Sequence, residues 1–453
     1  MTGSGGNLPF QRFFRPKRST RIYWMRIVLC AGMAWACLSL LPAQTPPVTI
    51  NLHEALDRAK AFNPQFLASN VGASLAHEDK VQAKSALLPS LSNFSQYIYT
   101  QGDGYPSGTF VANDGVHVYN EQAVMHADLF SATKRADYRR AMAAEAVARA
   151  KQDIALRGLA AAVMQNYYAV IVAQRHLGNA TRSVDEAQRF LDITERQERG
   201  GEVARADVIK GQLQLQQRQR EQMDAATNRE KAKLMLGVML FADIDQPFEV
   251  VDDLQPEVPL PPLEETRSLA LTANPELRAA EAGVQQADFG IQSARGAYLP
   301  ALSLDYFFGI DANVFGVTGP DSRQNLGSVV QGTMTVPIWN WGAIRSKVRQ
   351  AELTRQQAET DLTFARRQIQ ADVSAYYLEA QAARAQLESL RSSVDLASES
   401  VRLTLLRYQA GEAVALEVVD AQSTLAQARN GYDDGLARYR LALANVQTLT
   451  GRF

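Results

Sequence analysis

Cysteine is almost absent from this chain, and its absence excludes several kinds of chemistry. The two cysteines among the 453 residues are Cys30 and Cys37, both near the amino end. Beyond Cys37, disulfides, thiolate metal sites and cysteine nucleophiles are therefore excluded. No pair of histidines has metal-ligand spacing on an expected helix, and no phosphate-binding loop or hydrolase motif occurs. We therefore expect a protein that is not an enzyme and carries no cofactor or metal.

The chain also lacks an excess of positive charge. It has 47 basic and 48 acidic side chains, which gives a net charge of −1. Nucleic-acid-binding proteins usually carry a basic excess, so no nucleic-acid partner is expected. The balance is uneven along the chain, because residues 1–43 hold six basic residues and no acidic one. The remainder then has 41 basic and 48 acidic residues, a net charge of −7.

Long apolar runs are rare, and the one that stands out lies near the amino end. Residues 27–41 form a run of fifteen, shorter than the roughly 20 residues that a membrane-spanning helix needs. Basic residues precede the run and Pro42-Ala43 follows it. This pattern predicts a secretory signal peptide at residues 1–43, with Met25 as an alternative start, and hence an exported protein. A retained membrane anchor and lipidation at Cys37 are the alternatives.

The sequence contains one internal duplication. Four landmarks recur at offsets of 209 to 211 residues: Asn63-Pro64 with Asn274-Pro275, Leu88-Pro89 with Leu299-Pro300, Tyr167-Tyr168 with Tyr376-Tyr377, and Gly201-Glu202 with Gly411-Glu412. A nearly constant offset over some 140 residues is hard to obtain by chance. We therefore predict two repeats, residues 44–241 and 263–453, joined by an acidic, proline-rich connector at residues 242–262 with a short strand at residues 248–250.

Each repeat has the same predicted layout of a helix, a strand hairpin, a long helix and a return helix. In the first repeat the last three elements are expected at about residues 91–129, 131–197 and 204–237. In the second they are expected at about residues 302–338, 342–409 and 414–450. The first helix of each repeat has about 25 residues and ends near Leu88 or Leu299, where a proline follows.

The hairpins alternate apolar and polar residues with a period of two, which indicates half-buried strands. In the second repeat one predicted face holds Leu302, Leu304, Tyr306, Phe308 and Ile310, and its partner strand adds Val330, Gly332, Met334, Val336 and Ile338. Strands of about 10 residues have the length of a tilted membrane-spanning strand. Aromatic residues that are candidates for belts at the membrane surface are Tyr97, Tyr99, Tyr119, Phe308, Phe315, Trp339 and Trp341.

The long helices and the strands both require partners. A proline-free stretch of about 67 residues would form a helix about 100 Å long, which has to pack along its length as coiled coils do. Each chain offers four strands, whereas bacterial membrane barrels have at least 8 and leave no open edge. If the strands span a membrane, several chains must therefore share one barrel.

These residues resemble the TolC family of outer-membrane efflux channels over about residues 50–453. The resemblance is carried by the Asn-Pro helix starts, the Leu-Pro entries to the first strand of each hairpin, the Gly-Glu turns, and Val336-Pro337-Ile338-Trp339 with Gly342. It implies a mainly α-helical protein with a transmembrane β part. It further implies a homotrimer that forms a 12-stranded β-barrel in the cell outer membrane of a Gram-negative-type bacterium, continued by an α-helical barrel in the periplasm.

The implied function is a passive exit channel of a tripartite efflux or type I secretion system. Its implied partners are a periplasmic adaptor (membrane fusion) protein, an inner-membrane pump of the RND, ABC or MFS type, and the lipid membrane. The alternative from the residues is a periplasmic coiled-coil adaptor or scaffold that does not span a membrane. That alternative would not need two matched hairpins with apolar faces.

The resemblance also points to a mouth at the periplasmic end. Glu417 and Asp420 lie three residues apart on a predicted helix and would form an acidic ring in a trimer, which favours cations. The implied turn and gate positions are Gly201, Asp207, Tyr408 and Gly411. Tyr408 and Asp207 match a tyrosine and an acidic residue that hold the mouth shut in the family. The family's arginine position is Ala413, and in the first repeat Lys210 stands where Asp420 would be.

Overall fold

The computed structural model describes residues 48–99, 117–254, 259–320 and 322–451. The predicted signal peptide at residues 1–43, Met25, Cys37 and the loop at residues 102–115 lie outside these residues. Contacts divide the chain into two units. In the smaller unit the described residues are 48 and 247–249. The larger unit, residues 49–246 and 250–453, holds every helix described below and a four-stranded sheet.

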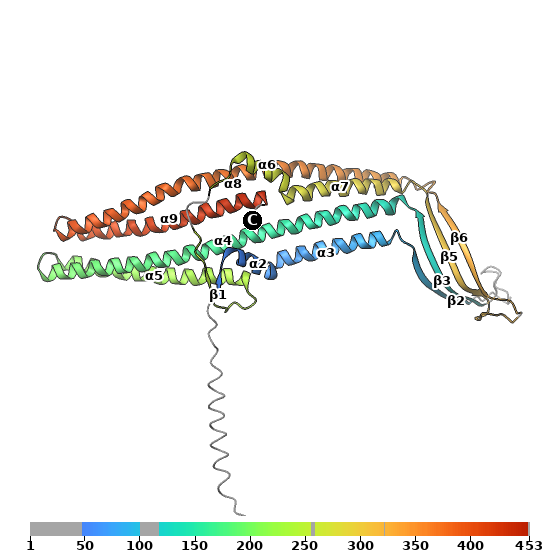
Figure 1. Ribbon diagram of the computed structural model, residues 1–453, viewed down its shortest axis with the longest axis horizontal. Coiled ribbons are helices and arrows are strands. Elements are labelled where there is room, and N and C mark those ends of the chain that lie inside the picture. The colour runs from blue at the N-terminus through green and yellow to red at the C-terminus, as the bar shows by residue number, and fades with distance from the viewer. Residues whose placement is uncertain (1–47, 100–116, 255–258, 321, 452–453) are drawn as a thin grey trace, which may run out of the picture. The chain divides into compact units, whose positions relative to one another are not determined.

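Two series of helices alternate with the strands along the chain (Figure 1). The helices before the short connector strand are α2 Leu52–Phe62, α3 Pro64–Ser85, α4 Ala132–Arg199 and α5 Arg205–Leu240. Those after it are α6 Leu263–Ala273, α7 Pro275–Gly296, α8 Ala343–Gln409 and α9 Ala415–Thr450. The strand β4, Phe248–Val250, pairs with β1, Val48–Ile50, in a separate two-stranded sheet. Within the described part of the chain, no helix is both long enough and apolar enough to cross a bilayer.

The repeated Asn-Pro pairs separate a short helix from a longer one. Asn63 ends α2, and its side chain accepts a hydrogen bond from the backbone N–H of Phe66 at the start of α3. Asn274 does the same between α6 and α7, where it accepts from the N–H of Glu276. The following proline suits the first helical turn, because its fixed φ is helical and its missing N–H is not needed there. The short helices α2 and α6 were not predicted.

The main sheet is built from the two hairpins side by side (Figure 1). Its strands, all antiparallel, are in spatial order β2 Ser90–Tyr99, β3 His117–Phe130, β5 Ala301–Ala312 and β6 Leu326–Thr335. Met125 lies opposite Tyr306, which lies opposite Val330 on the next strand. Since directly opposed residues share a face, these three belong to the apolar face predicted for Leu304 and its neighbours.

The predicted end of the last strand is wrong. The sequence pattern extended it to residue 338, with Val336 and Ile338 on the apolar face, but β6 ends at Thr335. The partner strand β5 begins at Ala301, which lies opposite Thr335, so the ladder ends there. Pro337, which follows, has no N–H to donate to a neighbouring strand. Ile338 instead lies in the connection to α8 with 91% of its surface exposed.

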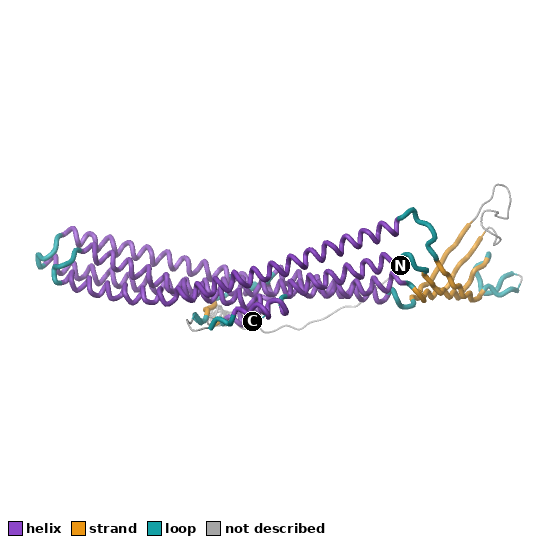
Figure 2. The backbone as a smooth tube through the Cα atoms, turned by 90° about the horizontal axis from the view of Figure 1, so that it is seen from above, coloured by secondary structure: helices purple, strands orange, loops and turns teal. Residues whose placement is uncertain are grey.

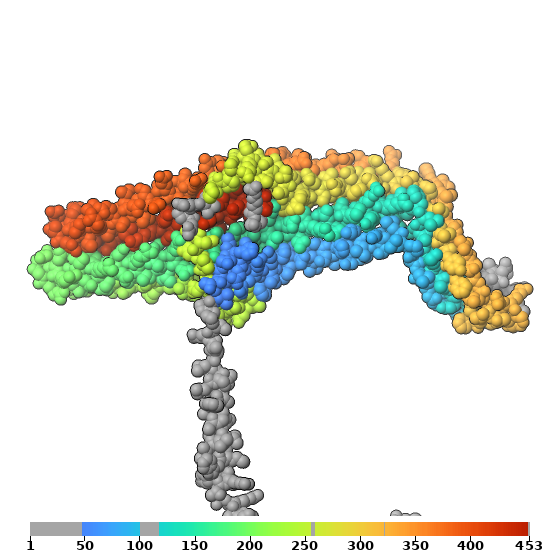
Figure 3. All heavy atoms as spheres, in the orientation of Figure 1, coloured from blue at the N-terminus to red at the C-terminus, as the bar shows by residue number. Residues whose placement is uncertain are grey.

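The helical core forms where α4 packs against α5, α7 and α9, while α8 packs against α7 and α9. Figure 2 shows these helices running beside one another, and Figure 3 shows atoms of the α8–α9 pair in contact with those of α4 and α5. The two repeats are buried unequally. Tyr167 is fully buried and Tyr168 nearly so, whereas their counterpart Tyr376 is 37% exposed. A repeated sequence landmark therefore does not have a repeated environment.

Candidate functional site

The turn that joins α4 to α5 (residues 200–204) and the turn that joins α8 to α9 (residues 410–414) lie at the same end of the helices, away from the strands (Figures 1 and 2). In both turns a glycine has a left-handed backbone, with φ of 76° at Gly201 and 77° at Gly411. The next residue then folds back onto the helix, since Glu202 N–H donates to Gln197 O at 2.9 Å. Glycine is favoured in this conformation because it has no Cβ to clash. The repeated Gly-Glu pair is thus a helix-ending motif.

Tyr408 joins the second helical pair to the first at this end. Its side chain is 2% exposed and packs in a cluster with Phe190, Ala415 and Val418, with the Phe190 ring centroid 5.3 Å away. The Tyr408 hydroxyl donates to Thr194 Oγ1 at 3.2 Å. Burial raises the pKa of Tyr408, so the hydroxyl keeps the proton that it donates.

The resemblance implies that Asp207 and Tyr408 act together, but each of the two side chains forms its hydrogen bond with a different residue. Asp207 accepts from Lys210 Nζ at 3.2 Å, and the hydrogen bond of Tyr408 goes to Thr194 instead. The negative charge of Asp207 still lies near enough to contribute, after burial, to the raised pKa of Tyr408. Thr194 was missed because a threonine inside a long helix carries no sequence signal for a contact 214 residues away.

The two acidic residues of the predicted mouth have different surroundings. Glu417 Oε2 lies 3.3 Å from Arg407 Nη1, and Glu417 Oε1 accepts from the backbone N–H of Val414 at 3.4 Å. Glu417 therefore caps α9 and is paired with a cation. Asp420 is exposed, and its carboxylate has no ion pair or hydrogen bond within the described residues. Of the two, Asp420 presents the less compensated negative charge.

Most of the predicted belt residues form two groups at opposite ends of the sheet. Near the loops between strands, the Tyr119 ring lies 5.0 Å from Tyr97 and 5.8 Å from Phe315, measured between centroids. Near the helices, the rings of Trp339 and Trp341 are 5.6 Å apart, and these residues are 75% and 89% exposed.

Tyr99 and Phe308 are the two remaining predicted belt residues, and they lie in different parts of the sheet. Tyr99 lies with the loop-side group and faces His117 at 5.2 Å between ring centroids. Phe308 lies within β5, opposite Ala123 and Ser328, and belongs to neither group.

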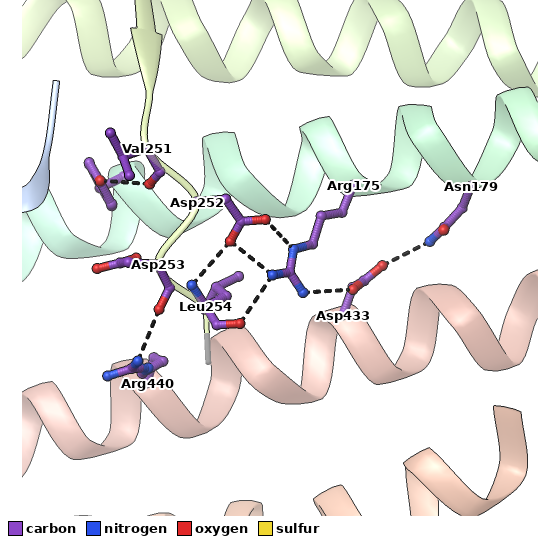
Figure 4. A network of polar contacts seen from close by, with 9 residues as sticks. Arg175, Asn179, Val251, Asp252, Asp253, Leu254, Asp433 and Arg440 are labelled. Atoms are coloured by element: carbon purple, nitrogen blue, oxygen red, sulfur yellow. Dashed lines mark hydrogen bonds and ion pairs between the residues drawn. The ribbon is translucent and has the colours of Figure 1, made fainter. Parts of the chain in front are cut away.

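A second polar site, which sequence reasoning missed, ties the connector after β4 to the helices (Figure 4). Arg175 on α4 donates from Nε to Asp252 Oδ2 at 2.6 Å and from Nη2 to Asp252 Oδ1 at 2.8 Å. The same guanidinium donates to Leu254 O at 3.0 Å and to Asp433 Oδ1 on α9 at 3.2 Å. Asn179 Nδ2 donates to Asp433 Oδ2 at 2.8 Å. These five residues are called the Arg175 network below.

The Arg175 network places one guanidinium between two carboxylates, those of Asp252 and Asp433. Burial lowers the pKa of Arg175, but hydrogen bonds and attraction from Asp252 and Asp433 outweigh this and raise the pKa overall. A neighbouring contact holds the same connector, with the Tyr167 hydroxyl donating to Val251 O at 2.8 Å. The acidic composition of the connector was visible in the sequence, but nothing indicated which cation would pair with it.

Comparison with known proteins identifies the class to which this architecture belongs. The family model described as outer membrane efflux protein matches residues 55–240 and 266–452. The chain therefore belongs to the outer membrane efflux protein family, which confirms the resemblance to TolC-type channels. The two matched ranges correspond to the two series of helices and strands on either side of the connector.

Individual relatives support the same conclusion. The chain is 23% identical over 427 residues to the alkaline protease secretion protein AprF of Pseudomonas aeruginosa, covering 91% of this chain and 86% of that protein. It is 24% identical over 411 residues to outer membrane protein TolC of Vibrio cholerae, covering 88% and 90%. The fold matches the CmeC outer membrane channel of Campylobacter jejuni with a TM-score of 0.75 at 17% identity, covering 88% and 85%.

These findings decide between the two functions that the sequence left open. The protein is an outer-membrane efflux channel protein that extends into the periplasm, and it is not a periplasmic adaptor or scaffold. Its family and fold are those of passive channels.

Proposed function

We propose that three copies of this chain form the exit channel of a tripartite efflux or type I secretion system. The observation that carries this proposal is the four-stranded sheet, whose outer strands β2 and β6 each have one unpaired edge within the described part of the chain. An open strand edge in lipid leaves backbone groups without partners, which costs several kcal/mol for each group. Three chains would contribute twelve strands, an even number within the range of bacterial barrels.

In this assembly the two faces of the sheet have different roles. The face with Tyr306, Phe308 and Val330 is proposed to contact lipid, and the face with Asp305 and Thr333 is proposed to line a water-filled lumen. The separation of the aromatic groups supports this orientation, because tryptophan and tyrosine are enriched at both membrane–water interfaces. We propose that Trp339 and Trp341 mark the periplasmic interface, and that Tyr97, Tyr99, Tyr119 and Phe315 mark the opposite one.

The helices would continue the lumen into the periplasm and meet the rest of the export machinery. We propose a periplasmic adaptor protein and an inner-membrane pump of the RND, ABC or MFS type as partners, with the channel itself performing no catalysis. The similarity to a relative named as a secretion protein supports an export role of this kind. We also propose the organisation into a signal peptide at residues 1–43, repeats at residues 44–241 and 263–453, and a connector at residues 242–262.

Membrane fractionation tests the channel proposal directly. The full chain, expressed in a Gram-negative host, is expected in the outer-membrane fraction as an assembly that survives gel electrophoresis unheated. Boiling is expected to convert it to a monomer band, in agreement with a chain of 49.8 kDa before processing. A predominantly soluble periplasmic pool, or a monomer without heating, would overturn the proposal.

The helical turns are proposed to form the periplasmic mouth, with Glu417 and Asp420 from three chains around it. Since Glu417 is paired with Arg407, we expect Asp420 to supply most of the attraction for cations. In single-channel recordings, Asp420→Asn should weaken block by multivalent cations more than Glu417→Gln does. Glu388→Gln is the matched control, because Glu388 is an exposed residue of α8 far from the turn. Unchanged block in both mouth variants would reject the acidic ring.

A further inference from the structure

Basic residues occur near the starts of both α4 and α8. These two helices directly follow the strand hairpins (Figure 1). Neither helix has an acidic residue in its first turn. Acidic residues are favoured there, because the amino end of a helix carries a partial positive charge. Here Arg135 follows soon after the start of α4, and Arg345 after the start of α8. These arginines oppose the helix dipole, so helix stability does not explain them.

On α4, the arginines project on the side of the apolar sheet face. The guanidinium carbon of Arg135 lies 5.6 Å from the ring centroid of Phe130. Phe130 lies opposite Leu302, which belongs to the apolar face of the sheet. Arg139 is one turn further along α4 and so lies on the same side of the helix as Arg135.

On α8, the arginines point away from a cavity on the other side of the helices. This cavity, of about 500 Å³, is lined by residues of α4, α7 and α8, including Arg140 and Lys347. Arg345 and Arg349 are each two residues from Lys347, which places them about 160° from it around a helix of 3.6 residues per turn. Arg135 and Arg139 on α4, and Arg345 and Arg349 on α8, form two pairs on helices that each pack against α7. The two pairs together are called the arginine cluster below.

The arginine cluster has unused capacity for hydrogen bonding. Arg139 and Arg345 are exposed and make no ion pair within the part of the chain that the structure describes. Arg349 lies 3.7 Å from Glu352, but 71% of its side chain is exposed. An exposed pair of this kind is weak and leaves most of the guanidinium free to bind another group.

The arginine cluster also lies at a suitable depth. At 1.5 Å per residue, its members lie within about 12 Å of the start of their helices, and the exposed Trp339 and Trp341 directly precede α8. Side chains on a helix lean toward its amino end, which here is the end that adjoins the strands. Long arginine side chains can therefore reach toward the membrane surface while their helices stay in water.

We propose that the arginine cluster binds anionic phospholipid headgroups of the membrane leaflet that faces the periplasm. Guanidinium groups bind phosphate oxygens through paired hydrogen bonds, and a negatively charged lipid adds attraction that a zwitterionic lipid lacks. This contact would fix how deeply the channel sits in the membrane. It rests on the proposed function, because that assigns the apolar face of the sheet to lipid.

The test compares lipid binding by the full-length assembly and by two sets of variants. Delipidated protein in detergent is titrated with phosphatidylglycerol or phosphatidylcholine, and bound lipid is counted by native mass spectrometry. The wild type should prefer phosphatidylglycerol at low salt. Replacing all four arginines of the cluster by glutamine should weaken that binding by roughly fivefold for each arginine removed. Inorganic phosphate should not compete, because it lacks the acyl chains that place the headgroup beside the cluster.

The matched control is Arg140→Gln with Lys347→Gln, which removes positive charge from the same helix ends but on the cavity side. This control should keep the preference for phosphatidylglycerol. If the fourfold variant does not assemble, Arg139→Gln with Arg345→Gln should show a smaller loss of the same preference. Equal binding of both lipids by the wild type, or equal losses in the control and the cluster variants, would overturn the proposal.

Failure of the lipid site and failure of the channel proposal remain distinguishable. A wild type that is found in the outer membrane as a heat-sensitive assembly, yet binds both lipids equally, overturns the arginine cluster alone. A wild type that is absent from the outer membrane overturns the channel proposal, on which the cluster rests.

Discussion

Replacing Arg175 by methionine should loosen the contact between the connector, α4 and α9. The substitution keeps a long apolar side chain but removes every hydrogen bond that the guanidinium donates in the Arg175 network. Asp252 and Asp433 then keep their negative charges without the cation between them. Asp433 retains the hydrogen bond from Asn179 at 2.8 Å, so it is not left entirely without a partner.

The size of the effect follows from how far the partners are buried. The side chain of Asp433 is 11% exposed, that of Arg175 26% and that of Asp252 43%. Breaking a fully buried ion pair costs about 3–5 kcal/mol, because an unpaired charge is left in the interior. An exposed pair contributes only about 0–1 kcal/mol. The intermediate burial and the remaining Asn179 contact place the expected cost at about 2 kcal/mol.

Because membrane assemblies often unfold irreversibly, the suitable measurement is a rate. The purified assembly is held at a fixed high temperature in detergent, and its loss of heat-sensitive migration is followed over time. If the contact is already broken in the transition state for unfolding, a destabilisation of about 2 kcal/mol makes the loss of the assembly roughly 30 times faster. Arg438→Met is the matched control on α9, because the ion pair of Arg438 with Glu379 has side chains that are 50% and 45% exposed.

Two outcomes would refute this reasoning. The first is an Arg175→Met variant that loses its assembly no faster than Arg438→Met does. The second outcome is measured on the double variant Arg175→Met with Asp433→Asn. This variant also removes the negative charge of Asp433 that Arg175→Met leaves without its cation. The second substitution should offset part of the first, by about 1 kcal/mol, since residues in one ion-pair network are coupled. Purely additive effects would show that the two side chains act independently.

Two further predictions concern other contacts. Tyr408→Phe should cost about 1 kcal/mol through the lost hydrogen bond to Thr194, and Tyr408→Ala about 3–5 kcal/mol through the cavity that it leaves. The same heating assay measures both, and equal effects would exclude a packing role. Hydrogen bonds from Lys80 and His77 lower the pKa of Glu145 from 4.5 to about 2. The stability that the ionised Glu145 carboxylate contributes to the fold is thus fully present above pH 4.5 and is lost as the pH falls through about 2. The difference in thermal stability between wild type and Glu145→Gln should shrink over that range, and a pH-independent difference would contradict this.

Local patterns in the sequence predicted the hairpins, the long helices and the return helices in their order, but not the short helices α2 and α6. Apolar alternation with a period of two marked the strands, because side chains of a strand point to alternate faces. Long stretches without proline marked α4 and α8, since proline would interrupt their backbone hydrogen bonds. The Gly-Glu pairs marked the turns, because the left-handed backbone at Gly201 and Gly411 is a property of residues next to one another in the chain. The predicted end of β6 was too late, because the alternation of apolar and polar residues continues past Pro337 although the strand ends at Thr335.

Only the tertiary structure decided which distant residues meet. Tyr408 contacts Thr194 across 214 positions, and Arg175 contacts Asp433 across 258, so neither partner could be chosen from spacing. Nor could the duplication show that Tyr167 is buried while Tyr376 is exposed, because burial depends on which helices cover a residue. The sequence by itself determined most of the local elements and the family of this protein. The packing of its helices decided which of the repeated residues carry contacts between the two halves.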